Sequence, residues 1–316
     1  MMAKRLLIVY NLDHPWVRSV ALEHVPEEFE LRFPDDAIES LLPKADFLVS
    51  GRVLPEWVPL LKNCRLVQKF GVGLDTVDVE GLRRAGIPLA TSPTLTPEGV
   101  AEHTLMLILA LWRQLIPIHL GVREGGFDVF GCREDIHLLH GKRVGIVGLG
   151  RIGRKVARLL HAFEVDTLYS DPLRPPPELE WELGLQAVSF DEIITCSDVV
   201  TVHTPLTAET RRLFGAAEFA RMKPGALFIN TCRGDTYDLD ALHRALASGH
   251  LGGAGLDVFH PEPPPPEHPL LRLPNVVLTP HNASGTVERH HAIAREHFIN
   301  CQRVLAGEVP LHLVEG

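Results

Sequence analysis

The chain has 316 residues and a mass of 35.0 kDa, more than the roughly 150 residues of a typical domain, so two domains with separate cores are expected. Its 40 acidic residues outnumber its 31 basic ones, which leaves no positive field to attract nucleic acid or an anionic membrane. The longest apolar run, Leu105 to Trp112, is far shorter than the roughly 20 residues that cross a bilayer. The sequence therefore predicts neither nucleic acid nor a membrane as a partner.

The cysteines bear on the cellular compartment. There are five, far apart and without a C-x-x-C pair, so neither a disulfide framework nor a zinc knuckle is indicated. They are Cys64, Cys132, Cys196, Cys232 and Cys301. The apolar stretch Leu6 to Tyr10 is too short for a signal-peptide core and is expected to form a buried strand. These observations favour a reducing, cytoplasmic compartment.

Short β-rich runs alternate with helical stretches in two series, which predicts an α/β fold with two doubly wound parallel-sheet domains. The first series predicts strands at 5–10, 29–33, 47–50, 66–70 and 87–90, with a helix over 75–85. A helix over 97–115 and an irregular glycine-containing stretch over 121–131 follow. The second series predicts strands at 143–147, 166–170, 185–188, 199–203, 226–230, 255–259 and 276–278, with a helix over 154–163. A last helix over 286–306 is expected to pack back on the first domain.

A glycine-rich motif directly follows the predicted strand 143–147 and opens a helix. In it, Gly148 permits a tight turn, Gly150 lets the backbone approach a pyrophosphate, and Gly153 allows close packing of helix on strand. The next strand ends at Asp171, where a carboxylate would bind the ribose hydroxyls of adenosine and repel a 2′-phosphate. The alternative is a glycine-rich turn with an incidental acid after the strand. Because strand, motif, helix and acid occur in order, we expect NAD rather than NADP.

Three polar blocks follow later strands of the second series and contain Arg233, Glu262 and His281. The carboxyl ends of parallel strands share one edge of the sheet, where ligands bind in open α/β folds. An arginine offers a planar fork to a carboxylate, a histidine offers a titratable proton, and an acid orients the histidine. Singly, these residues could be a surface cation, a solvated loop acid and a helix cap. Together they favour the chemistry that hydride transfer needs.

With these motifs in view, the sequence resembles the D-isomer-specific 2-hydroxyacid dehydrogenases over nearly its whole length. The resemblance extends to Gly71-Val72-Gly73-Leu74-Asp75, Val100-Ala101-Glu102-His103-Thr104 and His203-Thr204-Pro205-Leu206. It implies a Rossmann-type NAD-binding domain over 97–284, inserted into a flavodoxin-like catalytic domain made of 1–96 and 285–316, with the substrate in the cleft between them. It also implies a homodimer formed through the cofactor domain, to which Leu105 to Trp112 could contribute unless that run is buried in the core.

The resemblance implies a role for individual residues. Arg233 would bind the substrate carboxylate and carbonyl, His281 would transfer the proton, and Glu262 would pair with His281. Asp257 would contact the nicotinamide carboxamide, and the backbone near Val72 and Gly73 would hold the other side of the carboxylate. The implied cofactor-binding residues are Gly148, Gly150, Arg151, Ile152, Gly153, Asp171, His203, Thr204, Pro205, Thr231, Cys232, Asp257 and Ser284.

The expected activity is reversible NAD-dependent reduction of a 2-oxo acid to a D-2-hydroxy acid. An NADH-sensing binding protein of the corepressor type is the alternative from another class, and NADH consumption would distinguish the two. A formate-type dehydrogenase is disfavoured because Glu262 supplies an acid where that branch, by resemblance, carries an amide. Arg52 follows a strand of the first domain and would meet a phosphate or second carboxylate, unless it is a solvated surface residue.

Other histidines and the chain end complete the expectations. His260 stands near Glu262 and could compete for it, although a loop histidine is the simpler reading. His290 and His297 lie two helical turns apart with His291 off their face, so these three are expected to be solvated and no metal site is predicted. The chain stops at Gly316, soon after the last helix, so feedback control through an appended regulatory domain is not expected.

Overall fold

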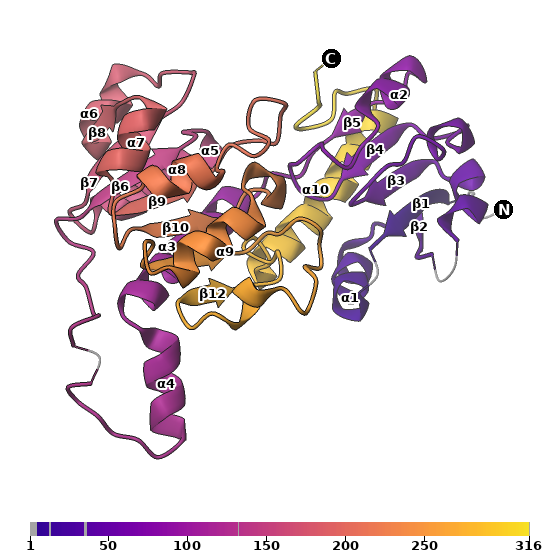
Figure 1. Ribbon diagram of the computed structural model, residues 1–316. Helices are drawn as coiled ribbons and strands as arrows, with labels where there is room; N and C mark the ends of the chain where they lie inside the picture. The colour runs from indigo at the N-terminus through magenta and orange to yellow at the C-terminus, as the bar shows by residue number, and fades with distance from the viewer. Residues whose placement is uncertain (1–4, 13, 35–36, 132, 316) are drawn as a thin grey trace. The chain divides into compact units, whose positions relative to one another are not determined.

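The computed structural model describes residues 5–12, 14–34, 37–131 and 133–315 (Figure 1). The chain divides into two compact units. The first combines Met1–Thr96 with Gly285–Gly316, and the second is the continuous segment Pro97–Ser284. Both contain a parallel sheet with helices, so the predicted α/β class with two doubly wound sheets is confirmed.

The first unit contains a five-stranded parallel sheet in the order β2-β1-β3-β4-β5. The strands are β1 (Leu6–Asn11), β2 (Phe29–Arg32), β3 (Phe47–Ser50), β4 (Leu66–Lys69) and β5 (Leu89–Ala90). Its helices are α1 (Pro15–His24), α2 (Val79–Arg84) and α10 (Val287–Leu305), with 3₁₀ turns at Ile38–Ser40, Leu42–Lys44 and Val58–Leu60. The strand order reverses between β1 and β3, which is where open α/β sheets bind ligands.

The second unit contains a seven-stranded parallel sheet in the order β12-β11-β10-β9-β6-β7-β8. The strands are β6 (Arg143–Val147), β7 (Asp166–Ser170), β8 (Leu185–Ala187), β9 (Val199–Val202), β10 (Leu227–Asn230), β11 (Gly253–Leu256) and β12 (Val276–Leu278). The helices are α3 (Thr96–Trp112), α4 (Leu115–Arg123), α5 (Arg151–His161), α6 (Pro177–Leu183), α7 (Phe190–Cys196), α8 (Ala216–Arg221) and α9 (Leu239–Ala247), with 3₁₀ turns at Gly234–Thr236 and Pro269–Arg272. Here the order reverses between β6 and β9.

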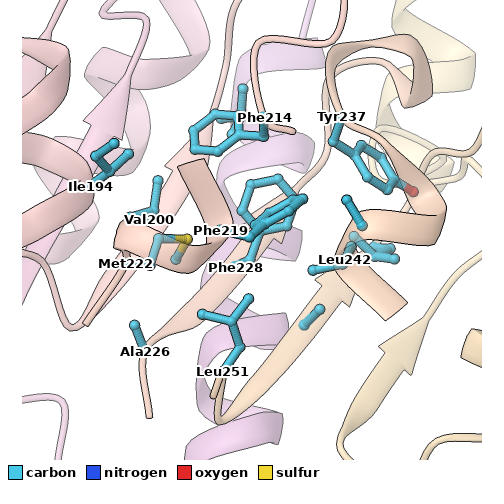
Figure 2. Packing of buried hydrophobic residues seen from close by; sticks show 14 of the residues in the cluster. Ile194, Val200, Phe214, Phe219, Met222, Ala226, Phe228, Tyr237, Leu242 and Leu251 are labelled. Atoms are coloured by element: carbon cyan, nitrogen blue, oxygen red, sulfur yellow. The ribbon is translucent and has the colours of Figure 1, made fainter. Parts of the chain in front are cut away.

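The central strand β10 shows why this sheet is covered on both faces. Successive side chains of a strand point to opposite faces, and Phe228 joins one buried cluster while its neighbours Leu227 and Ile229 join another. In the first cluster the Phe228 ring lies 5.0 Å from that of Phe214 and 5.1 Å from that of Phe219 (Figure 2). Continuous apolar runs are typical of such doubly covered parallel strands. Both faces of the sheet are therefore packed, and this packing holds the strand ends from which the loops leave.

Two elements differ from the sequence prediction. The sequence predicts one helix over 97–115 and an irregular stretch over 121–131, whereas α3 ends at Trp112 and a second helix, α4, runs from Leu115 to Arg123. Pro117 is its third residue, and the first four N–H groups of a helix need no partner within it, so the proline is tolerated there. The strand predicted at 255–259 lies instead at Gly253–Leu256, because pairing with β10 and β12 fixes its register.

Helix α3 contains the long apolar run, and α4 continues beyond it. In the described part of the chain, no single helix is long and apolar enough to span a membrane. The pair α3 and α4 meets a length and composition criterion together, but the two helices are bent by 64°. Leu107 and Ile108 of α3 are fully buried, whereas α4 exposes five apolar side chains, namely Leu115, Ile116, Ile118, Leu120 and Val122.

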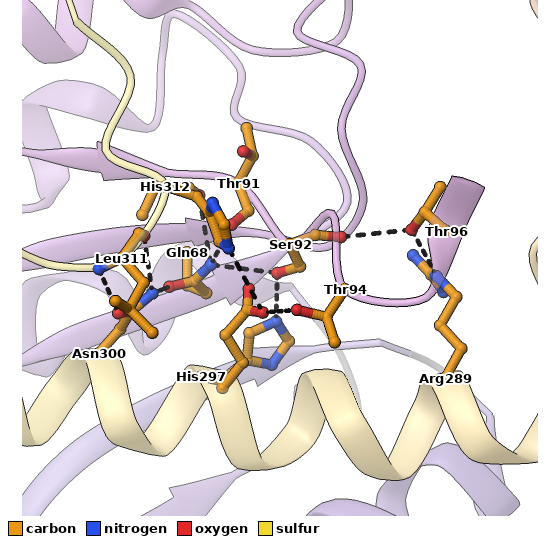
Figure 3. A network of polar contacts seen from close by, with 12 residues as sticks. Gln68, Thr91, Ser92, Thr94, Thr96, Arg289, His297, Asn300, Leu311 and His312 are labelled. Atoms are coloured by element: carbon orange, nitrogen blue, oxygen red, sulfur yellow. Dashed lines mark hydrogen bonds and ion pairs between the residues drawn. The ribbon is translucent and has the colours of Figure 1, made fainter. Parts of the chain in front are cut away.

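The helix α10 contributes a buried polar network to the first unit (Figure 3). The ring of His297 is fully buried, with Nδ1 3.1 Å from the Tyr10 hydroxyl and Nε2 2.8 Å from Ser92 Oγ. Asn300 donates to Gln68 Oε1 at 2.9 Å and is also fully buried. The expectation that His297 is solvated is therefore wrong. The helix packs on the sheet with polar side chains inside, and His297 and Asn300 have hydrogen-bond partners there.

Burial lowers the pKa of His297 to about 3, and the charge of Arg289 acts in the same direction. The unfolded chain, with a histidine pKa of about 6.5, binds a proton between these values while the folded chain does not. The free energy of unfolding should therefore fall by about 1.4 kcal/mol per pH unit from this residue as the pH drops from about 6 to 4. In His297→Gln, which retains a donor for Ser92, urea unfolding should show a correspondingly shallower pH dependence. Equal slopes in the two proteins would contradict a neutral buried ring.

Candidate active site

The chemistry-bearing residues of the second unit gather at one edge of its sheet. All of its strands run parallel, so their carboxyl ends lie on the same side. The loops that leave these ends contain Gly148 after β6, Asp171 after β7, His203 after β9, Arg233 after β10, Asp257 after β11 and His281 after β12. Gly148 and His203 follow β6 and β9, the pair at which the strand order reverses.

The glycine-rich loop after β6 is tightly packed on one side and open on the other. Gly148 has a φ of +93°, and a Cβ added to it would lie 2.8 Å from His203 O. A Cβ on Gly153 would lie 2.2 Å from Gly148 O, so this close approach of loop and helix requires glycine. Around Gly150, by contrast, a Cβ would meet no described atom within 4 Å. That open side, at the N-terminus of α5, offers backbone N–H groups to an anion.

Asp171 links the ends of β6 and β7. Its Oδ2 accepts the N–H of Leu149 at 2.6 Å, and its Oδ1 accepts the N–H of Leu173 at 2.7 Å. Each carboxylate oxygen has a second lone-pair direction, so the group can still accept hydrogen bonds from a ligand. The acid thus fixes the glycine-rich loop and remains available to hydroxyl groups beside it.

The loop after β9 contains buried polar atoms that lack a partner. His203 Nδ1 and Thr204 Oγ1 make no hydrogen bond within the described structure, although His203 Nε2 lies 2.9 Å from Thr201 Oγ1. Burial lowers the pKa of His203 to about 3, so its ring is neutral. Buried polar atoms without partners are uncommon in native proteins and point to a missing ligand or water. Together with the open side of the glycine-rich loop, they fit a dinucleotide at this edge.

The other residues expected to contact a cofactor lie on the same loops or at the start of α5. Thr231 and Cys232 are buried, and the Thr231 hydroxyl lies 3.2 Å from that of Thr104 in α3. Arg151 is exposed and Ile152 half-buried in the first turn of α5, Pro205 is exposed, and Ser284 is half-buried in the turn that follows β12.

Glu262 and His281 form a hydrogen-bonded pair. His281 Nδ1 lies 2.8 Å from Glu262 Oε2, while Glu262 Oε1 accepts the N–H of Phe259 at 2.9 Å. Burial opposes ionisation of Glu262, but these hydrogen bonds and the charges of His281 and Arg233 outweigh it, so the pKa of the carboxyl is lowered. A carboxylate on Nδ1 leaves Nε2 of the half-exposed ring available for proton transfer.

Arg233 is brought to this pair by close packing of two loops. Gly234 follows it, and a Cβ on Gly234 would lie 2.0 Å from the backbone carbon of Phe259, so only glycine allows this approach. Arg233 Nη1 donates to Cys232 O at 2.6 Å, which orients the half-buried guanidinium. The effect of the Arg233 charge on Glu262 follows from this proximity.

His281 adopts a backbone conformation that is unusual for a residue with a side chain. Its φ is +51°, in the left-handed region, which costs roughly 1–2 kcal/mol outside glycine. Its N–H donates to Asp257 O at 2.7 Å, and the buried Asp257 carboxylate accepts the N–H groups of Asn282 and Ala283 at 3.0 and 2.9 Å. Hydrogen bonds on both sides of His281 therefore hold the turn.

His103, which the sequence motif included without a role, supports the same turn. Its Nε2 lies 2.9 Å from Thr279 Oγ1, and that hydroxyl donates to Asp257 Oδ1 at 2.6 Å. Burial lowers the pKa of His103, although the nearby Asp257 opposes the change. The sequence does contain a signal for this role. His103 is a polar residue in a largely apolar helix, at a position that faces the carboxyl ends of the strands.

His260 does not share Glu262. Its Nδ1 lies 3.0 Å from Asp235 Oδ2, and Asp235 also pairs with Arg211. This pairing gives His260 a partner within its own loop region and leaves Glu262 bonded to His281.

The substrate residues expected in the first unit lie in loops after its strands. Val72 and Gly73 are half-buried in the turn that follows β4. The exposed Arg52 follows β3, and its guanidinium lies 5.7 Å from the ring centroid of Trp57, a cation–π contact.

Comparison with known proteins identifies the family. Residues 105–283 match the model of the D-isomer specific 2-hydroxyacid dehydrogenase NAD-binding domain. A glyoxylate reductase of Korarchaeum cryptofilum is 38% identical over 315 residues, covering 93% of this chain and 92% of the relative. The TT0316 protein of Thermus thermophilus has a TM-score of 0.84 at 33% identity, covering 99% of this chain and all of that one.

A third relative is a formate dehydrogenase. The NAD-dependent enzyme of Staphylococcus aureus, solved with NAD, has a TM-score of 0.85 at 29% identity and covers 98% of this chain and 99% of its own. The matched family model covers more than half of this sequence and includes the glycine-rich loop and the Arg233, Glu262 and His281 loops. The chain therefore belongs to the D-isomer-specific 2-hydroxyacid dehydrogenases and is an NAD-dependent oxidoreductase.

Proposed function

We propose that this dehydrogenase reduces a 2-oxo acid to a D-2-hydroxy acid, and catalyses the reverse reaction, with His281 as the acid and base. The observation that carries the proposal is the 2.8 Å contact between His281 Nδ1 and the Glu262 carboxylate, beside Arg233 at the carboxyl edge of the sheet. A relative named glyoxylate reductase supports this substrate class, because glyoxylate is the simplest 2-oxo acid.

In the reaction NADH supplies the hydride, and the 2-oxo acid, NADH and a proton become the hydroxy acid and NAD⁺. His281, held on Nδ1 by Glu262, delivers the proton to the carbonyl oxygen from Nε2 and takes it back during oxidation. The fork of Arg233 pairs with the substrate carboxylate and polarises the carbonyl. In this proposal the backbone of Val72 and Gly73 binds the other side of the carboxylate. Arg52, stacked on Trp57, is the candidate for a further anionic group.

We assign the cofactor to the glycine-rich edge. The N-terminus of α5, with Gly148, Gly150, Arg151, Ile152 and Gly153, would hold the pyrophosphate. Asp171 would accept the adenosine ribose hydroxyls and disfavour NADP. The unpartnered atoms of His203 and Thr204, with Pro205, Thr231, Cys232 and Ser284, would line the remaining length, and Asp257 would face the nicotinamide carboxamide.

We also propose a homodimer in the cytoplasm. The exposed apolar side chains of α4, rather than the largely buried run in α3, support a second copy as the partner. Light scattering of the purified protein measures its mass. The cysteines Cys64, Cys196, Cys232 and Cys301 are free thiols, which supports a reducing compartment, and Cys132 lies outside the described residues.

The primary test is NADH consumption with glyoxylate, hydroxypyruvate, pyruvate and, in the oxidative direction with NAD⁺, formate. His281→Ala should lower kcat by roughly 10²- to 10⁴-fold, because the proton donor is lost. Arg233→Lys keeps the charge but loses the planar fork, so KM should rise strongly and kcat should fall. A fluorescence titration should show that both variants still bind NADH. Turnover of the unaltered protein with formate alone, or with no substrate of the panel, would refute the proposal, as would full activity of His281→Ala.

The pairing of Glu262 with His281 predicts a pH effect. Reduction requires the protonated imidazole, and the Glu262 carboxylate stabilises its positive charge. Glu262→Gln should therefore move the pH limit of reduction to lower pH, as measured from kcat/KM profiles. His260→Gln is the matched control, because His260 pairs with Asp235, and its profile should not move. A shift in the control of the same size would assign the role to His260 instead.

Asp171 predicts the cofactor preference. Asp171→Asn keeps an oxygen acceptor for one loop N–H but removes the charge, whereas Asp171→Ala removes both. The ratio of kcat/KM for NADH over NADPH should fall by roughly 10- to 100-fold in each variant, because the 2′-phosphate is no longer repelled. If the unaltered enzyme already used NADPH better, this assignment of Asp171 would be wrong.

A further inference from the structure

A second cluster of ligand-type side chains lies in the first unit, where α1 ends beside α10. His24, the last residue of α1, places Nε2 2.9 Å from Nδ1 of His291 in the second turn of α10. Glu23 Oε1 lies 4.0 Å from the same His291 nitrogen. One ligand atom from each of these three residues lies within 4.8 Å of the others.

We propose that Glu23, His24 and His291 form a binding site for a divalent transition-metal ion of the zinc type. Two imidazoles and one carboxylate are a ligand set that such ions accept, with water completing the coordination. The sequence analysis predicted no metal site, because His291 has no suitable ligand partner among the histidines of its own helix. The partners of His291 come from α1, which lies more than 260 residues earlier in the chain.

The observed spacing requires only small movements to accept an ion. Two nitrogens that each lie about 2.05 Å from a tetrahedrally coordinated zinc are about 3.3 Å apart. The His24 and His291 nitrogens, now at hydrogen-bond distance, would separate by a few tenths of an ångström. The Glu23 oxygen, 4.0 Å from His291 Nδ1, would approach that nitrogen by about 0.7 Å, and its side chain is 63% exposed.

The contact between the two rings and the charges around it also bear on metal binding. The positive charge of Arg295 acts on His24, and the negative charge of Glu23 opposes it. The two facing ring nitrogens, 2.9 Å apart, are joined by one hydrogen bond. On metal binding that hydrogen would move to the other nitrogen of its own ring, so that both facing nitrogens donate lone pairs to the ion. Arg295 is the charge that opposes the cation.

Such an ion would connect the end of α1 to the start of α10 within one unit. These helices pack against each other, with the Trp16 ring 4.8 Å from that of His290. The ion would bind only the folded arrangement, since the three ligands come from distant parts of the chain. Binding of this kind stabilises the folded state in proportion to the free ion concentration.

The test uses the full-length protein freed of metal with a chelator. Titration with Co²⁺ should give visible absorption bands that saturate at one equivalent, and Zn²⁺ should abolish them. Zn²⁺ should also raise the Tm. His24→Gln and His291→Gln should each weaken binding by at least roughly 10- to 100-fold. Both variants should retain the NADH-dependent activity and the metal-free melting behaviour of the parent protein.

Two further variants separate this site from general metal binding. His140→Gln removes an exposed histidine that pairs with Glu164 at 3.1 Å, a two-ligand contact, and should leave the titration unchanged. Arg295→Gln removes the opposing charge and should tighten binding, a gain that misfolding cannot produce. Absence of Co²⁺ bands and of a Zn²⁺-dependent Tm shift in several-fold excess would overturn the proposal. It would equally fail if the His24 and His291 variants bound as tightly as the parent, if His140→Gln lost the same affinity, or if Arg295→Gln failed to tighten binding.

Discussion

The buried carboxylate of Asp257 organises the candidate active site. It accepts hydrogen bonds from the Thr279 hydroxyl and from the N–H groups of Asn282 and Ala283. The backbone carbonyl of Asp257 accepts the N–H of His281. These contacts enclose His281 on both sides and compensate for its left-handed backbone. A buried, unpaired carboxylate would be costly, so the turn and the acid stabilise each other. Loss of either would release the histidine from its position beside Glu262.

The loops on either side of this turn depend on the same kind of close packing. Gly234 lets the loop after β10 contact the loop after β11, and Gly148 lets the loop after β6 contact the carbonyl of His203. In each case a side chain would push apart two strand ends. Backbone contacts between neighbouring loops thus position the polar groups at this edge. The aromatic cluster around Phe228 packs against the strands from which those loops leave.

The sequence predicts most strands because each is a short apolar run, and it places the glycine-rich motif because strand, glycines and helix are adjacent in the chain. It could not locate β11, since Gly253 and Gly255 have poor strand propensity while Val258 and Phe259 have more, and only pairing with β10 decides the register. It did not predict α4, because Pro117 and Gly121 have low helix propensity. The sequence also led to the prediction that His297 is solvated, because its partners Tyr10 and Ser92 lie near the other end of the chain.

The placement of α10 has a consequence for synthesis of the protein. The buried side chains Phe298 and Cys301 of this helix pack with Ile8, Tyr10 and Phe47 of the first sheet. Because a ribosome synthesises the chain from the N-terminus onward, the strands of the first sheet emerge long before the helix that completes its core. The continuous segment from Pro97 to Ser284 has all its residues available earlier. Completion of the core of the first unit must therefore wait for the synthesis of α10, and until then the sheet lacks the apolar side chains that this helix contributes.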